Sequence, residues 1–275
     1  MNTNSKPAII NVLLWLASVA SMIGIMFISG RLFKEDNFVL LIEFIVITIV
    51  TLIFLYLVSG KKTFTYLNNQ TGYTVRMLLP TLIFPGFFAL MSIISLIMNK
   101  PALNENWLKN IVLLTINMFL VGIYEEGCFR ACACDALLPA FKKCRHPFLL
   151  TAVISSLLFG YVHVVRVDFS DLQQVIQFTL KILTVAMTGI TYMILYWKTR
   201  NLLGLAIVHC LNDFLPSFMF EIFKWENITE TGYTSGNSGT TIVYIVQLVF
   251  NIACLIYVYR KVGKTIDYRK TLEEW

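Results

Sequence analysis

The sequence predicts an all-α, polytopic integral membrane protein of about eight transmembrane helices that surround a polar cavity inside the membrane. Hydrophobic residues make up 57% of the 275 residues and charged residues only 14%, against about 25% in soluble domains. The mean hydropathy is +0.71, and the apolar residues gather in runs close to the ~20 residues that a spanning helix needs. This composition excludes an ordinary soluble globule.

Eight apolar runs account for most of the chain. In order they are Ile9 to Gly30, Phe38 to Ser59, Met77 to Met98, Trp107 to Phe141, Phe148 to Val165, Val175 to Trp197, Leu202 to Phe220 and Ile242 to Tyr259. The first three and the last are almost free of charged residues, so each is expected to cross the bilayer. The sixth and seventh are also long enough to span it, although each contains ionisable residues.

The fourth and fifth runs depart from this pattern. Trp107–Phe141 is longer than a bilayer requires and carries charges, so part of it is expected to lie at an interface or along a polar cavity. Phe148–Val165 is short and would need tilt or a locally thinner bilayer. The chain shows no internal repeat and no second domain, so residues 1–275 are predicted to form a single membrane domain.

The basic residues predict how the chain is oriented. A net charge of +6 on a soluble chain could indicate nucleic-acid binding, but here it fits basic loops between membrane spans. Lys and Arg counted in alternate loops give 14 on one side of the membrane and 6 on the other. The positive-inside rule therefore predicts a multi-pass protein of the cell membrane with both termini in the cytoplasm, in contact with lipid and not with nucleic acid.

The fourth run contains a cluster of charged residues. An ionisable side chain at the bilayer centre costs about 2.5 to 3.5 kcal/mol on insertion scales, so its presence needs a reason. Glu126 and Arg130 are spaced i and i+4, which predicts that they pair along one face of the helix. Glu125 points roughly 100 degrees away from that face and is left available.

Two later runs add further polar residues. The fifth ends with Phe159 and His163, and the seventh contains His209, Asn212 and Asp213. His209 and Asp213 share one helix face, and Asn212 flanks it. Three separate helices therefore each contribute polar groups that could meet inside the bundle.

Structural roles are an alternative for each of these residues. A single His or Asn within a span often serves only as a hydrogen-bonding residue between helices. The Glu126–Arg130 pair could be a buried ion pair that fixes helix register, and Phe159 could be a packing residue. The whole set of carboxylates, imidazoles and a carboxamide in an otherwise nearly charge-free core favours a functional site.

The polar residues resemble the signature of a known family. Three ordered motifs, Glu125-Glu126-x-x-x-Arg130, Phe159-x-x-x-His163 and His209-x-x-x-Asp213, are similar to those of the CAAX protease and bacteriocin-processing (CPBP or Abi) family of intramembrane endopeptidases. This family includes the eukaryotic Ras-converting CAAX prenyl endopeptidase. The resemblance covers about residues 107–220, which we take as the catalytic core. The family's last motif usually ends in Asn, with Asp as a frequent variant, and here Asp213 takes that place with Asn212 before it.

The resemblance implies an eight-span helical fold with a conical cavity open to the cytoplasm and the membrane. It also implies hydrolysis of a peptide bond near the C-terminus or the membrane anchor of a peptide or lipidated protein substrate. The supporting residues would be Glu126, Arg130 and Phe159, with Glu126 and Arg130 holding the site together.

The resemblance also implies catalytic roles. Glu125 would be the general base that activates water, aided by His163, while His209 with Asn212 or Asp213 would polarise the scissile carbonyl. Amide hydrolysis needs hydrogen-bond donors where the oxyanion develops, and an ionised Asp cannot donate. We therefore expect that Asn212 donates, or that Asp213 orients His209 or is protonated.

Metal dependence is open at this stage. Family members have also been described as metalloproteases, and Glu125, His163 and His209 would form a plausible zinc set with water in the open position. The chain lacks an HExxH motif, and water activation by Glu and His needs no metal. The sequence therefore favours metal-independent hydrolysis without a cofactor, with zinc as the alternative.

Two other functions fit parts of the sequence. A non-catalytic member of the same family type, such as a bacteriocin self-immunity factor or a regulatory membrane protein, would have the same hydrophobic architecture. A secondary transporter would also need intramembrane Glu, Arg and His. Transporters commonly show inverted repeats, whereas the polar residues here lie only in the fourth to seventh runs, which makes this the weaker alternative.

Overall fold

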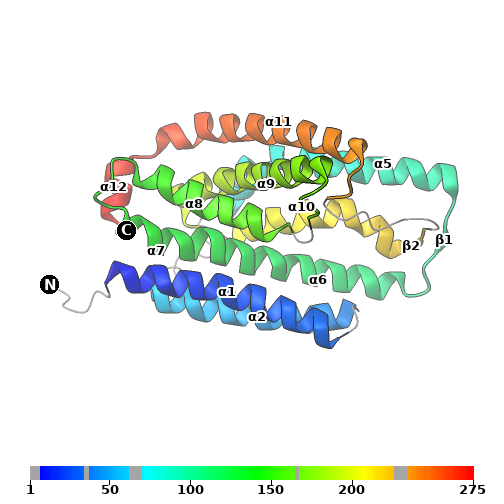
Figure 1. Ribbon diagram of the computed structural model, residues 1–275, viewed down its shortest axis with the longest axis horizontal. Coiled ribbons are helices and arrows are strands. Elements are labelled where there is room, and N and C mark those ends of the chain that lie inside the picture. Colours follow the sequence, from blue (N-terminus) through cyan, green and yellow to red (C-terminus); the bar gives the residue numbers. More distant parts are fainter. Residues whose placement is uncertain (1–6, 34–36, 62–69, 165–166, 226–233) are drawn as a thin grey trace.

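The computed structural model describes residues 7–33, 37–61, 70–164, 167–225 and 234–275 (Figure 1). Its main helices are α1 (Ala8–Leu32), α2 (Asn37–Ser59), α4 (Thr71–Leu78), α5 (Ile83–Asn99), α6 (Trp107–Glu126), α7 (Ala133–Ala140), α8 (Pro147–Val162), α9 (Leu172–Thr199), α10 (Leu202–Ile222), α11 (Ser238–Lys261) and α12 (Tyr268–Glu273). Shorter helical segments are η1 (Leu79–Leu82), the π-helical η2 (Gly127–Cys132) and η3 (Gly263–Thr265). The strands β1 (Ala102–Leu103) and β2 (Phe223–Lys224) pair antiparallel.

The helices confirm the prediction of an all-α polytopic membrane protein. Among the described residues, seven helices are long and apolar enough to cross a membrane, with α4–η1–α5 and α6–η2–α7 each counted as one. Helix α8 is apolar but has only 16 residues, which agrees with the shortness of the fifth run. Large apolar side chains point outward, as in α1, where Ile9, Leu13 and Phe27 are each more than half exposed. Such an outer surface suits lipid.

The helices form a bundle in which successive membrane-spanning helices run in opposite directions (Figure 1). Helices α1 and α2 pack on each other and against the α6–η2–α7 helix. On the other side, α6 packs along α10, and α9 packs against both α8 and α11. The start of α1 and helix α12 lie at the same end of the bundle, and the β1–β2 pair lies at the opposite end.

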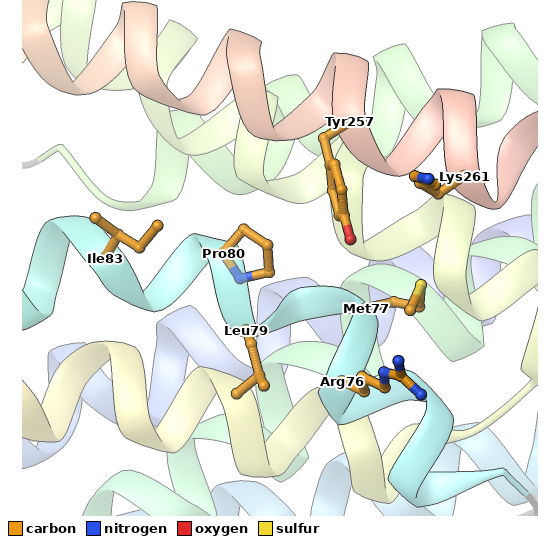
Figure 2. A pocket seen from close by; sticks show the side chains of 7 residues that line it. All are labelled: Arg76, Met77, Leu79, Pro80, Ile83, Tyr257 and Lys261. Carbon is orange, nitrogen blue, oxygen red and sulfur yellow. The ribbon is translucent and has the colours of Figure 1, made fainter.

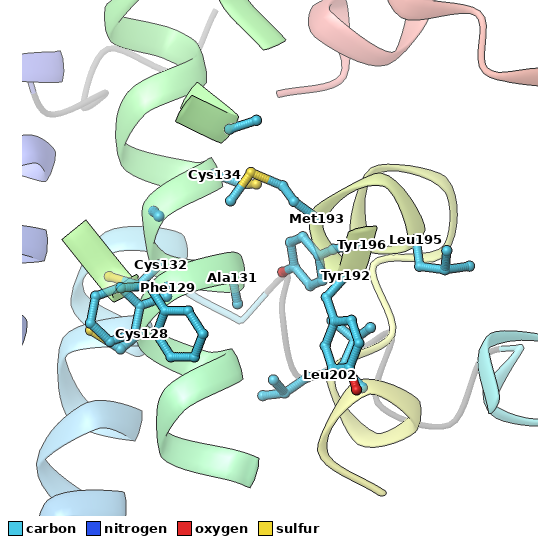
Figure 3. Packing of buried hydrophobic residues seen from close by; sticks show 14 of the residues in the cluster. Cys128, Phe129, Ala131, Cys132, Cys134, Tyr192, Met193, Leu195, Tyr196 and Leu202 are labelled. Atoms are coloured by element: carbon cyan, nitrogen blue, oxygen red, sulfur yellow. The ribbon is translucent and has the colours of Figure 1, made fainter. Parts of the chain in front are cut away.

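The most deeply buried packing lies around η2, α7 and the C-terminal half of α9. Cys132, Cys134, Met193 and Leu195 are completely buried there. Figure 3 shows Met193 reaching from α9 toward Cys134. This close packing fixes α9 against the helix that carries the first polar motif.

The π-helical segment η2 interrupts the fourth span directly after Glu126. A π turn disturbs the regular backbone hydrogen bonds, and within a membrane every freed carbonyl needs another donor. Two buried side chains supply them: Trp15 Nε1 donates to the Cys128 carbonyl at 3.2 Å, and Ser155 Oγ donates to the Phe129 carbonyl at 2.6 Å. Helices α1 and α8 are thereby tied to the segment that presents Arg130.

Two glycines allow helices to approach closely near the polar residues. A Cβ atom on Gly122 of α6 would lie 2.5 Å from the backbone oxygen of Ala206 on α10. A Cβ atom on Gly160 of α8 would lie equally close, at 2.5 Å, to the backbone oxygen of Ile182 on α9. Small residues at such crossings are typical of packed membrane helices. Gly122 lies one turn before Glu126, and Ala206 one turn before His209, so the first crossing sets the distance between those two side chains.

Gly122→Leu is expected to destabilise the protein by at least ~1–3 kcal/mol, because the new side chain meets backbone atoms of α10 that cannot turn away. Thermal unfolding in detergent measures this. The matched control is Gly24→Leu on α1, where an added Cβ has no heavy atom within 4 Å. An equal melting temperature for both variants would show that the α6–α10 crossing tolerates separation.

Candidate active site

His209 lies at the centre of a cluster of carboxylates. Its Nδ1 is 2.6 Å from Glu126 Oε1, a distance at which the ring N–H donates to the carboxylate. Its Nε2 lies 3.2 Å from Glu125 Oε2 and 3.4 Å from Asp213 Oδ2. The tight turn before α10 places this residue: Arg200 adopts a left-handed conformation, and Asn201 then caps α10 by accepting from Gly204 N at 2.6 Å.

Glu125 lies between the two histidines. His163 Nε2 is 3.7 Å from the same Glu125 oxygen that His209 approaches. His163 immediately follows α8, and its Nδ1 donates to the Phe159 carbonyl at 2.7 Å, which leaves Nε2 directed at Glu125. The Glu125 side chain is 10% exposed and that of His163 is 23% exposed. Both groups can therefore be reached from the cavity described below.

Arg130 and Glu126 form the buried pair that the sequence predicts. Arg130 Nε lies 3.1 Å from Glu126 Oε2, and the two side chains are 1% and 0% exposed. The guanidinium also lies 4.1 Å from the centre of the Phe159 ring, a cation–π distance. The Phe159 ring therefore contacts Arg130 of η2, and the Phe159 backbone carbonyl orients His163, which follows it in the same part of the chain. The role of Phe159 is more specific than apolar packing.

Asn212 contacts a residue that the sequence reasoning missed. Its side-chain nitrogen donates to the Tyr192 hydroxyl at 2.6 Å and to the Val208 carbonyl at 3.1 Å, so both of its amide hydrogens are engaged. Tyr192 on α9 is buried and lines the cavity. No pattern in the sequence distinguishes this tyrosine from the other apolar and aromatic residues of its span. Asp213, in contrast, is 40% exposed and faces the cavity.

A cavity of about 740 Å³ adjoins these residues. Arg130 and Tyr192 lie at its deep end, while Met118, Ser217 and Gln247 line it farther along α6, α10 and α11. These three residues lie toward the helix ends opposite α12, so the cavity extends away from the end of the bundle that carries α12. The resemblance implies a cavity open to the cytoplasm, and the basic residues predict a cytoplasmic α12 end. The implied cavity also opens to the membrane, and both expectations stay predictions.

The cavity walls are mostly apolar, with one further cation. Phe84 and Phe88 of α5 face it, as do Met22 of α1 and Val185 of α9. Lys181 of α9 also lines the cavity and lies 5.7 Å from the Tyr244 ring centre. The sequence places Lys181 inside a span, but only the structure shows that it shares the cavity with the carboxylates.

The structure brings together the residues of all three motifs. Glu126 and Arg130 pair as predicted, and His209 shares a face with Asp213, while Glu125 meets both histidines. The difference concerns Asn212, whose amide is directed at Tyr192. Asn212 also lines the cavity, with its amide nitrogen bonded to Tyr192 and Val208 in this structure.

The candidate zinc set does not present a metal-binding arrangement. Within the described part of the chain, no group of three His, Cys, Asp or Glu side chains could hold a metal ion. His163 Nε2 and His209 Nε2 approach one and the same oxygen of Glu125, at 3.7 and 3.2 Å. The two imidazole nitrogens thus face the carboxylate oxygen directly, as in a hydrogen-bonding cluster.

Part of the chain is similar to a known family. Residues 107–215 match a family model described as Rce1-like, type II CAAX prenyl endopeptidase. This segment contains every residue of the three motifs, from Glu125 to Asp213. No curated protein and no solved structure matches the chain. The family is one of membrane proteases that act on peptide or protein substrates. Residues 107–215 are thus similar to Rce1-like type II CAAX prenyl endopeptidases, within a chain whose described helices are those of a multi-pass membrane protein.

Proposed function

We propose that this protein is an intramembrane endopeptidase that hydrolyses a peptide bond of a membrane-associated or C-terminal peptide substrate with a water molecule activated by Glu125. The observation that carries the proposal is the approach of His163 and His209 to one oxygen of Glu125 at the wall of a partly apolar cavity. This cluster lies within the segment that matches the family. We place the catalytic core at about residues 107–220 of a single membrane domain.

In the first step Glu125 acts as general base. Water in the cavity can contact both Glu125 and His163, because the 3.7 Å between their facing atoms is too long for a direct hydrogen bond. Glu125 takes a proton from this water as the oxygen attacks the scissile carbonyl carbon. When the C–N bond breaks, Glu125 returns that proton to the leaving amine. The carboxylate is thus regenerated at the end of the cycle.

His209 stabilises the charge that develops on the carbonyl oxygen. Its Nδ1–H is held by Glu126, which fixes the ring so that Nε2 faces the cavity. With both nitrogens protonated, Nε2–H donates to the oxyanion, and the surrounding carboxylates balance the imidazolium charge. Asp213 orients the ring from the cavity side at 3.4 Å. Arg130 holds Glu126 in place from the far side.

Asn212 acts through Tyr192 in this mechanism. The Tyr192 hydroxyl accepts a hydrogen bond from Asn212 and also contacts the Thr81 side chain, so in this mechanism its O–H turns from Thr81 toward the cavity when the oxyanion forms. Asn212→Ala and Tyr192→Phe are each expected to lower kcat by about 10²-fold, the loss typical of one oxyanion donor. The double variant should lose little more than either single variant, since both remove the same donor.

The matched comparison for this prediction is Asp213→Ala, which removes a side chain that cannot donate when ionised. It should lower activity less than Asn212→Ala does. Full activity in both Asn212→Ala and Tyr192→Phe would exclude this pair from the stabilisation of the oxyanion. Kinetics on the purified protein measure each value.

The proposed function is tested with the purified full chain in liposomes. Peptides with and without a farnesylated cysteine near the C-terminus are incubated in H₂¹⁸O and followed by mass spectrometry. Hydrolysis predicts a shortened peptide whose new carboxylate carries one ¹⁸O atom. Chelator treatment followed by zinc addition belongs in the same assay, because we propose a metal-independent reaction. Activity that vanishes with chelator and returns with zinc would overturn that part of the proposal.

Two measurements separate this function from the alternatives. In the same liposomes, a secondary transporter would move a solute or ion and leave every peptide intact. In cells, an immunity or regulatory protein would keep its phenotype after Glu125→Gln, whereas a protease would lose it.

We further propose a location in the cell membrane with both termini in the cytoplasm. The first six residues lie outside the described part of the chain.

A further inference from the structure

A second cavity lies outside the candidate active site. It is a groove of about 610 Å³ between the α4–η1–α5 segment and the C-terminal end of α11 (Figure 2). Arg76 and Lys261 lie at one end of the groove, and Ile83 lies at the other. None of the residues that line it belongs to the three motifs of the active site.

The cations of this groove lack a counter-charge among the described residues. Arg76 comes from α4 and Lys261 from α11, both are exposed, and none of the described residues that line the groove is acidic. Neither side chain takes part in an ion pair or side-chain hydrogen bond with another described residue. Two positive charges held at one end of a groove repel each other unless an anion lies between them. Their placement therefore favours an anionic ligand.

The rest of the groove is apolar. Leu79 and Ile83 are 49% and 64% exposed, and the Tyr257 ring extends from α11 toward η1 between them and the cations. Tyr257 lies one helical turn farther from the end of α11 than Lys261, and Ile83 lies deeper in its span than Arg76. The groove is thus charged near the helix ends and apolar toward the membrane centre. Tyrosine at the boundary is typical of the membrane interface.

This profile matches one molecule of phospholipid. We propose that the groove between η1 and α11 binds an anionic phospholipid, with its phosphate between Arg76 and Lys261 and an acyl chain along Leu79 and Ile83. A free phosphate would use only the charged end. Basic pockets between membrane helices at the side rich in Lys and Arg are suited to acidic headgroups, and this groove lies at the α12 end of the bundle.

Occupancy of the groove would also affect the bundle. The lipid contacts both α11 and the segment that leads into α5, and these two helices supply Val243, Gln247, Phe84 and Phe88 to the wall of the active-site cavity. A lipid that bridges them holds this side of the cavity together. Binding should therefore raise the melting temperature of the protein, since it stabilises only the folded state.

Native mass spectrometry of the purified protein in detergent tests the proposal, with phosphatidylglycerol as the anionic probe and phosphatidylethanolamine as the comparison. The wild type should retain one phosphatidylglycerol in preference to phosphatidylethanolamine. Arg76→Ala combined with Lys261→Ala should weaken that binding roughly 30-fold, which corresponds to about 1 kcal/mol for each cation. Arg260→Ala combined with Lys264→Ala makes the same change in charge at exposed positions outside the groove and should leave binding within about twofold.

Three outcomes would overturn the proposal. Equal retention of the two lipids by the wild type would remove the preference for an anion. Equal losses of phosphatidylglycerol binding in the two double variants would show that binding depends on the overall positive charge of this surface and not on a specific site. Displacement of the lipid by millimolar inorganic phosphate would show that only the charged end binds. Both double variants should melt at the wild-type temperature without added lipid, and only the wild type and the Arg260/Lys264 variant should be stabilised by phosphatidylglycerol.

Discussion

Glu125→Gln is expected to lower the rate of peptide hydrolysis by about 10²- to 10⁴-fold, the usual contribution of a general base. The amide has nearly the same shape as the carboxylate and can still contact His163 and His209, so the fold should be kept. What it cannot do is accept a proton from water at neutral pH. The measurement is the turnover of a cleaved peptide by purified protein, with the melting temperature as the check on folding.

The control for this substitution is Glu105→Gln. Glu105 is an exposed carboxylate whose Oε1 pairs with Lys224 Nζ at 2.9 Å, near the β1–β2 strands. The hydrogen bond and charge of Lys224 lower the pKa of Glu105, and because this ion pair is exposed, its removal should leave the melting temperature and the turnover unchanged. Turnover of Glu125→Gln equal to that of this control would refute the assignment of Glu125 as the base.

Arg130→Leu should destabilise the protein by about 3 to 5 kcal/mol, the usual cost of breaking a buried ion pair by removing one partner. Arg130 and Glu126 are 1% and 0% exposed, so water cannot solvate the Glu126 carboxylate that would be left without its partner. The substitution also removes the cation 4.1 Å from the Phe159 ring. Chemical or thermal unfolding in detergent measures the loss, and a lower yield of folded protein from the membrane is expected with it.

Arg31→Leu is the matched control, since Arg31 lies 4.2 Å from the centre of the Phe27 ring but is exposed at the end of α1. Arg31→Leu should lower the free energy of unfolding by about 1 kcal/mol or less. Arg130→Lys keeps the charge and is expected to fall between the two. If Arg130→Leu were as stable as Arg31→Leu, the ion pair would contribute nothing that apolar packing cannot replace.

The sequence predicts the parts of this protein that depend on local spacing. Glu126 and Arg130 pair because i and i+4 residues share a helix face, and the same geometry puts His209 beside Asp213. The shortness of the fifth run predicts the 16-residue helix α8. Membrane helices follow hydropathy closely because the bilayer leaves few other solutions for an apolar segment.

Contacts between distant residues could not be predicted in this way. The π-helical segment depends on Trp15 and Ser155, which reach its carbonyls from other helices, and Trp15 is 113 positions from Cys128. The Asn212–Tyr192 bond likewise joins two spans whose relative rotation no periodicity sets. The helical periodicity of apolar and polar residues predicts which face of each helix is polar, but it does not determine which faces of several helices meet.

The direction of the active-site cavity links the topology of the chain to the location of its substrate. Because the cavity extends away from α12, the proposed hydrolysis would take place toward the face of the membrane opposite that helix. A reporter fused after Trp275 would therefore also identify the substrate's compartment by exclusion. A cytoplasmic reporter would indicate exported or surface peptides, and an external one would indicate peptides made and modified inside the cell.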